Sequence, residues 1–144
     1  MQRLTMQQIQ DADLADWRKL AHGLHARFAT DGFTNGLDFV NAIGAAAETA
    51  DHHPDITLTW PTVDIVLVTH SEGGVTQADV DLARSISDIA REQGIASKLT
   101  VTAELELSLD TADASAVGPF WAALLTGTAD AYDGDEVRDP AGQV

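Results

Sequence analysis

Two stretches of the chain alternate apolar and polar residues with the period of a β-strand. Every second residue is apolar in residues 24–28, and residues 63–70 place three aliphatic side chains on one face in the same way. Such alternation is typical of a strand that buries one face. Residues 17–20 and 56–60 read as two shorter strands, and Gly23 marks a hairpin turn after the first of them. We therefore predict four strands.

Between the two pairs of strands, apolar residues recur at helical spacing. The pattern predicts an amphipathic helix over residues 37–50, whose alanines permit close packing on a sheet. Residues 30–36, which are rich in glycine and polar residues, are predicted to form a loop. Pro54 disfavours helical geometry at His53, so the helix should end at or just before the pair His52 and His53.

Two further helices are marked by capping-box patterns, in which a threonine is followed three residues later by a side chain that can accept a hydrogen bond. The patterns are Thr5 with Gln8, before a short helix over 5–17, and Thr76 with Asp79, before a helix over 76–93 that Gly94 should end. The resulting order predicts an α+β fold. It has an N-terminal helix followed by ββαββα, with a four-stranded antiparallel sheet and helices on one face.

Composition limits the class of protein. The 144 residues are 44% hydrophobic, enough for a core, and contain no apolar run that could cross a bilayer. The N-terminus lacks the apolar segment of a signal peptide, and the absence of cysteine excludes disulfides and thiolate metal sites. A net charge of −15 argues against binding nucleic acid through phosphates. We expect a cytoplasmic protein with neither membrane nor nucleic-acid partners.

The acidic charge is concentrated toward the C-terminus. Residues 1–103 contain 14 acidic and 7 basic side chains, whereas residues 104–144 contain 9 acidic and 1 basic. This shift is the clearest boundary signal in the chain. It predicts one domain over 1–100 and an acidic C-terminal appendage over 101–144.

A spaced set of histidines, acids and one tryptophan runs through the first domain. A His-His-Pro follows the predicted helix over 37–50. The other residues of this set lie near the end of that helix, on the next two predicted strands and at the start of the last predicted helix. The set is Glu48, His52, His53, Pro54, Trp60, His70 and Asp79. Residues 69–83, THSEGGVTQADVDLA, add paired glycines and a Thr-x-x-Asp. On these residues, positions 5–93 resemble the pterin-4a-carbinolamine dehydratase (4a-hydroxytetrahydrobiopterin dehydratase) family.

The resemblance implies a hydro-lyase that converts a 4a-hydroxytetrahydropterin into the quinonoid dihydropterin. Loss of water needs a proton delivered to the leaving hydroxyl and another taken from the neighbouring ring nitrogen. Imidazole suits both tasks, because its unperturbed pKa is about 6.5. By analogy with the family, the expected catalytic residues are His52, His70 and Asp79, and the expected substrate-binding residues are His53, Glu48 and Trp60. The reaction requires neither a metal nor a redox cofactor.

Each of these residues also has a purely structural interpretation. Asp79 occupies a capping-box position, although it could also accept a hydrogen bond from a site histidine. Trp60 is either core packing or a stacking wall for the flat heterocycle. Glu48 lies one helical turn before His52, and either orients it or is a solvated helix residue. A metal site is the rival interpretation, but adjacent histidines in an extended segment point apart and H-E-x-x-H is absent.

Residues 104–144 resemble the opening of a glyoxalase-like module of the vicinal oxygen chelate superfamily. The features concerned are a strand-like ELELSLD, a helix-like TADASAVGPFWAALLTG with its Phe-Trp pair, and a later Asp-Pro-x-Gly turn. Such a fold needs two repeats to enclose a metal, and this segment ends within the first. We therefore expect an incomplete module without metal ligands, whose acidic residues after about position 126 are partly disordered.

More than one function is open at this point. The leading interpretation is a dehydratase that recycles pterin oxidised by aromatic amino acid hydroxylases. Resemblance to the family also implies an alternative, since some members are protein-binding modules and one animal branch stabilises dimers of a homeodomain transcription factor. A third possibility is service in another pathway, such as assembly of a molybdopterin enzyme. The retained histidines favour the dehydratase, and the resemblance implies a homodimer or homotetramer.

Overall fold

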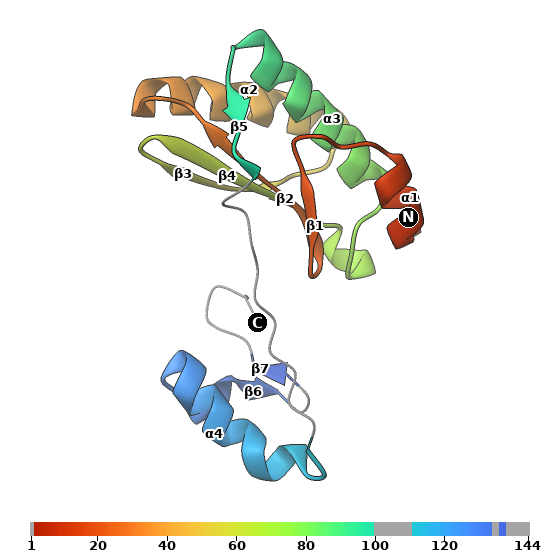
Figure 1. Ribbon diagram of the computed structural model, residues 1–144, viewed down its shortest axis with the longest axis vertical. Coiled ribbons are helices and arrows are strands. Elements are labelled where there is room, and N and C mark those ends of the chain that lie inside the picture. The colour runs from red at the N-terminus through yellow and green to blue at the C-terminus, as the bar shows by residue number, and fades with distance from the viewer. Residues whose placement is uncertain (1, 100–110, 134–135, 138–144) are drawn as a thin grey trace. The chain divides into compact units, whose positions relative to one another are not determined.

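The structure is a computed structural model that describes residues 2–99, 111–133 and 136–137. The chain divides into two compact units, residues 1–104 and 105–144 (Figure 1). The strand predicted over 104–110 and the Asp-Pro-x-Gly turn lie outside the described residues. In the part of the chain that is described, no helix combines the length and apolar character that a membrane span requires.

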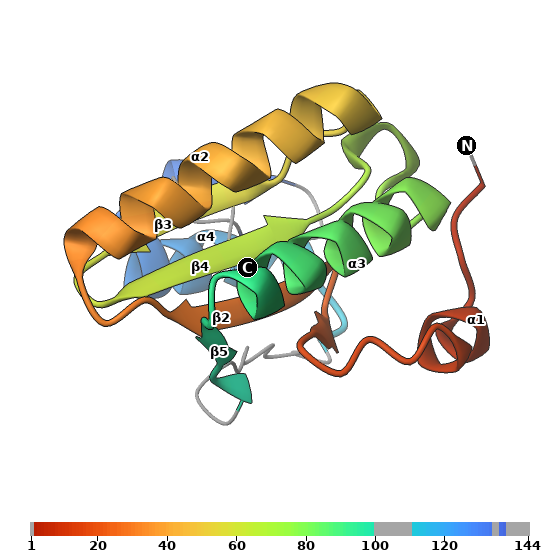
Figure 2. The ribbon, with the colours of Figure 1, turned by 90° about the horizontal axis from the view of Figure 1, so that it is seen from above.

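The larger unit is an antiparallel sheet with its two long helices on one face. Its elements are α1 (Met6–Asp11), β1 (Arg18–Leu20), β2 (Gly23–Ala29), α2 (Phe33–Ala50), β3 (Asp55–Thr59), β4 (Thr62–Leu67), the 3-10 helix η1 (His70–Glu72), α3 (Gln77–Glu92) and β5 (Ala96–Ser97). The strand order is β1-β2-β4-β3, and β5 pairs with the end of β2. Figure 2 shows α2 and α3 side by side over the sheet. The predicted α+β fold is confirmed, with the two-residue β5 as an addition.

The alternating residues of β2 and β4 build the core, as their pattern predicted. Val63, Ile65 and Leu67 are at most 1% exposed. From β2, the ring of Phe28 meets Phe39 of α2 edge-on, with 5.2 Å between the ring centroids. The sheet and α2 are therefore fixed to each other by apolar packing, which holds the ends of both elements in place.

Two predicted helix boundaries differ from the structure. The helix predicted over 5–17 ends at Asp11, shortly before Asp13, whose φ of 49° is left-handed. The helix predicted over 37–50 begins at Phe33, so the second half of the predicted loop is helical. Gly36 explains this early start, because a Cβ there would lie 2.6 Å from a methyl carbon of Leu58. Close packing on the sheet thus overrides the glycine-rich sequence.

The predicted stop and start signals next to the histidines are confirmed. α2 ends at Ala50, and Asp51 closes it in a left-handed conformation with φ of 48°. The capping box at Thr76 and Asp79 is present at the start of α3, and the equivalent pair Thr5 and Gln8 caps α1. β4 ends at Leu67, before the predicted position 70, and η1 begins at His70.

The smaller unit contains the helix predicted in residues 111–127. Its elements are α4 (Ala114–Thr126), the 3-10 helix η3 (Ala129–Ala131), β6 (Tyr132–Asp133) and β7 (Glu136–Val137), with β6 and β7 paired antiparallel. Asp113 caps α4, and hydrogen bonds from the Ser115 hydroxyl and the Ala116 amide lower the pKa of its carboxyl. Resemblance of this unit to a glyoxalase-like module stays a prediction.

Candidate active site

His52 and His53 lie where α2 ends, next to the start of α3. Figure 2 shows the C-terminal end of α2 and the N-terminal end of α3 at the same end of the helix layer. After the left-handed Asp51, the amide of His52 still donates to the carbonyl of Ala47 at 3.2 Å. The chain then passes through Pro54 into β3. The histidine pair is therefore held between the end of a helix and the start of a strand.

His70 reaches the same end of the sheet from β4. Asp55, the first residue of β3, is paired with Val66 of β4, so the chain after β4 runs past the start of β3. The imidazole Nε2 of His70 lies 3.9 Å from Oδ2 of Asp55, and both side chains are largely exposed. Antiparallel pairing thus brings His70 beside the segment that carries His52 and His53.

A buried carboxylate holds His52. Nε2 of His52 lies 2.7 Å from Oδ1 of Asp79, a side chain with no exposed surface, while the imidazole is 11% exposed. The other oxygen, Oδ2, accepts from the Thr69 hydroxyl at 2.7 Å and from the backbone amide of Thr76 at 2.7 Å. Asp79 therefore caps α3 with one oxygen and binds His52 with the other, so the two roles foreseen for it coexist.

This contact determines which nitrogen of His52 can act as a base. A carboxylate only accepts hydrogen bonds, so Nε2 of His52 carries the proton that points at Asp79. In the neutral ring the lone pair then resides on Nδ1. A proton accepted at Nδ1 creates an imidazolium whose charge faces the buried carboxylate. The pair is suited to taking up a proton from a bound molecule.

Glu48 contacts His53 and not His52, so of the two interpretations left open for it, the orienting of His52 has no contact behind it. Oε1 of Glu48 lies 3.1 Å from Nε2 of His53. The left-handed turn at Asp51 is the reason, because it directs the ring of His53 toward the last turn of α2 and the ring of His52 toward α3. Both side chains of the pair are exposed, at 80% for Glu48 and 60% for His53. This contact is weak compared with that of Asp79.

Within one chain, Trp60 lies away from His52, His53 and His70. It occupies the turn between Thr59 and Thr62, at the far end of β3 from Asp55. Trp60 follows Asp55 by five residues along this extended segment, which corresponds to roughly 17 Å. Its 71% exposure also excludes the core-packing interpretation.

Two further residues of the site were missed by the sequence reasoning. Asp55 directly follows the His-His-Pro and faces His70, and Thr69 directly precedes His70 and donates to Asp79. Their positions next to the motif were the available signal. Among the residues that the structure describes, no three histidines or carboxylates gather closely enough to hold a metal ion. Each of the three site imidazoles instead faces one carboxylate.

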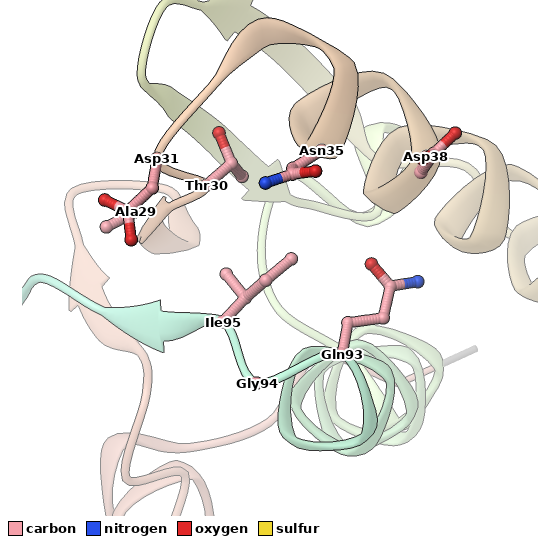
Figure 3. Close-up of a pocket in the computed structure, with 8 residues that line it drawn as sticks. All are labelled: Ala29, Thr30, Asp31, Asn35, Asp38, Gln93, Gly94 and Ile95. Carbon is pink, nitrogen blue, oxygen red and sulfur yellow. The ribbon is translucent and has the colours of Figure 1, made fainter.

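A pocket of about 360 Å³ lies at the opposite end of the helix layer. It is lined by Ala29, Thr30, Asp31, Asn35, Asp38, Gln93, Gly94 and Ile95. Figure 3 shows Ile95 pointing into the hollow between the start of α2 and the end of α3, with Asn35 and Gln93 on its two sides. None of the three site histidines contributes to this pocket.

Comparisons with known proteins point to one family. The model of the family described as pterin 4 alpha carbinolamine dehydratase matches residues 2–89. A protein of Mycobacterium avium named "Putative pterin-4-alpha-carbinolamine dehydratase" is 47% identical over 88 residues, which are 60% of this chain and 94% of that protein. A relative of the same name from Mycolicibacterium vanbaalenii is 43% identical over 88 residues, 60% of this chain and 95% of that protein.

The fold has a counterpart among solved structures. A transcriptional coactivator/pterin dehydratase from Brucella melitensis superposes with a TM-score of 0.58 and 34% identity, covering 61% of this chain and 98% of that one. The smaller unit lies outside the residues that the family model matches. Since that match spans more than half of the sequence and includes all three site histidines, the chain belongs to the pterin 4 alpha carbinolamine dehydratase family.

Proposed function

We propose that the chain is a dehydratase that removes water from a 4a-hydroxytetrahydropterin and yields the quinonoid dihydropterin. Family membership supports the substrate class and the reaction. The observation that carries the proposal is the contact between Nε2 of His52 and the buried Oδ1 of Asp79 at 2.7 Å. This contact fixes the tautomer of the His52 imidazole, at the end of the sheet where His53 and His70 also lie.

In the proposed reaction, the bond between the ring carbon and its hydroxyl oxygen breaks and the oxygen takes a proton to leave as water. The neighbouring ring nitrogen loses its proton, and a double bond forms between that nitrogen and the carbon. His52 takes the nitrogen's proton through Nδ1, because Asp79 stabilises the resulting imidazolium. His70, which is 80% exposed and beside Asp55, delivers the proton to the leaving oxygen.

His53 holds the substrate in this scheme, and Glu48 orients the His53 ring through the 3.1 Å contact. Trp60 of the same chain is left out, because it lies at the other end of β3. No metal or redox cofactor takes part, since the two proton transfers and the departure of water balance the reaction.

The test is a rate measurement with the 4a-hydroxytetrahydropterin, following the quinonoid product with and without protein. The reaction also proceeds unaided, so the rate above background is the quantity compared. His52→Ala and His70→Ala should each lower it by about 10²-fold or more, as expected for loss of acid–base assistance. His22→Ala, an exposed histidine in the turn between β1 and β2, is the matched control and should retain the wild-type rate. Wild-type rates in folded His52 and His70 variants would refute the mechanism.

A protein-binding role is the second candidate, supported by the description of the Brucella melitensis relative as a coactivator as well as a dehydratase. A chain that acts only in this way would show no rate above background. We also propose that the protein is a cytoplasmic homodimer or homotetramer. The support for the oligomer is the strand β3. Its outer edge has no strand partner within the described residues and can pair with another chain.

A further inference from the structure

The hydroxyl of Thr69 is buried between two parts of the candidate site. Thr69 is 7% exposed, and its neighbours Thr76 and Asp79 have no exposed surface. Its Oγ1 donates to Oδ2 of Asp79 at 2.7 Å and lies 2.8 Å from the hydroxyl of Thr76. A buried hydroxyl with such short contacts is fixed in one orientation, because any other would leave polar groups unpaired.

The backbone of Thr69 is fixed as firmly as its side chain. Its amide donates to the carbonyl of Gly74 at 3.1 Å, and its carbonyl accepts from the amide of Glu72 at 3.0 Å. These bonds close the short turn that contains η1 and therefore His70. The side chain of Thr69 thus joins the turn that carries His70 to the carboxylate that holds His52.

We propose that Thr69 is a positioning residue of this site, which sets the geometry of His52 through Asp79 and that of His70 through the turn. This inference rests on the proposed function and deepens it. With Thr69 in place, Oδ2 of Asp79 is occupied and Oδ1 is directed at His52. Without the hydroxyl, the carboxylate keeps only its contacts with Thr76 at this oxygen and can rotate away from the imidazole.

The test compares Thr69→Val, which removes the hydroxyl at nearly constant shape, with Thr69→Ser, which retains it. Thr30→Val is the matched control: Thr30 is also a buried threonine, 2% exposed, and its hydroxyl donates to the carbonyl of Pro61 at 3.1 Å, far from the histidines. We expect Thr69→Val to lower kcat by roughly 10-fold to 10²-fold with little change in KM, because a misplaced catalytic group slows the chemical step. Thr69→Ser should restore most of kcat, and Thr30→Val should leave it unchanged.

The second readout is the NMR signal of the Nε2 proton of His52, assigned by its absence from His52→Ala. A proton held against a buried carboxylate exchanges slowly with water, so the wild type, Thr69→Ser and Thr30→Val should show it. In Thr69→Val the signal of the His52 Nε2 proton should be lost or broadened. The amide signals of the sheet should still be those of a folded protein. A folded Thr69→Val protein with the wild-type signal would overturn the inference, as would wild-type kcat.

The two proposals fail in different ways. If the wild type shows no rate above background, the proposed function is wrong, and the His52 proton signal still decides whether Thr69 positions the imidazole. If the wild type is active and folded Thr69→Val keeps the wild-type kcat or the wild-type signal, the function stands and the role of Thr69 is refuted.

Discussion

The two ends of the layer formed by α2 and α3 differ in shape and in chemistry. At one end, where α2 stops and α3 starts, Asp79 is fully buried and every oxygen of its carboxylate has a donor. At the other end lies the pocket of about 360 Å³ (Figure 3), where Asn35 and Gln93 are exposed and Thr30 is buried. This pocket and the acid–base groups are therefore separated by the length of the helices.

This difference shows that a pocket and a cluster of acid–base side chains need not coincide in a single chain. Burying a carboxylate is costly unless its hydrogen bonds are satisfied, and at Asp79 both oxygens have donors. At the pocket, the carboxylates of Asp31 and Asp38 are exposed to solvent, so they carry no comparable cost of burial. The proposed pterin site is therefore assigned to the histidine end, although the hollow lies elsewhere.

The largest expected effect comes from Asp79→Asn at the histidine end. An amide nitrogen must replace one oxygen, and at either position it would meet a donor, from His52 on one side or Thr69 and Thr76 on the other. We expect the rate above background to fall by about 10²-fold or more. The free energy of unfolding, measured with urea, should fall by about 1–3 kcal/mol because a buried polar group loses its partner.

Asp81→Asn on the same helix is the control for Asp79→Asn, because its exposed side chain accepts only from Gln77, at 2.8 Å, and pairs with Arg84. It should leave both the rate and the stability close to the wild type. Equal effects of the two substitutions would show that the burial of Asp79 has no special importance.

A smaller effect is expected from Glu48→Gln, which changes the exposed contact with His53. Exposed ion pairs contribute about 0–1 kcal/mol, so the rate should change by less than about fivefold. Glu92→Gln, at the last residue of α3, provides the baseline for removing one surface charge. A loss from Glu48→Gln as large as that from Asp79→Asn would mean that His53 is as important as His52 in the chemistry.

Much of the fold could be predicted from the sequence because the decisive signals are local. The alternation in β2 and β4, the stop before Pro54 and the capping box at Thr76 each depend on a few neighbouring residues. The early start of α2 at Phe33 could not be read in this way. It depends on Gly36 lying against Leu58, a contact between distant parts of the chain.

The residues singled out in the sequence could be placed on their helices and strands, whereas their contacts could be predicted less well. The approach of His52 to Asp79 follows from where two helices end and begin, and both ends were foreseen. The partner of Glu48 depends on the left-handed conformation of Asp51, which no residue pattern indicated. The separation of Trp60 from the histidines follows from the strand pairing, which a linear spacing does not reveal.

The most direct test of the account is an NMR titration of the isotope-labelled full chain with dihydrobiopterin, a stable pterin. The account predicts shifts of the imidazole signals of His52 and His70 and of the amide of His53, with Asn35 and Gln93 unchanged. Shifts confined to residues around the pocket at the opposite end, with the three histidines unaffected, would contradict it.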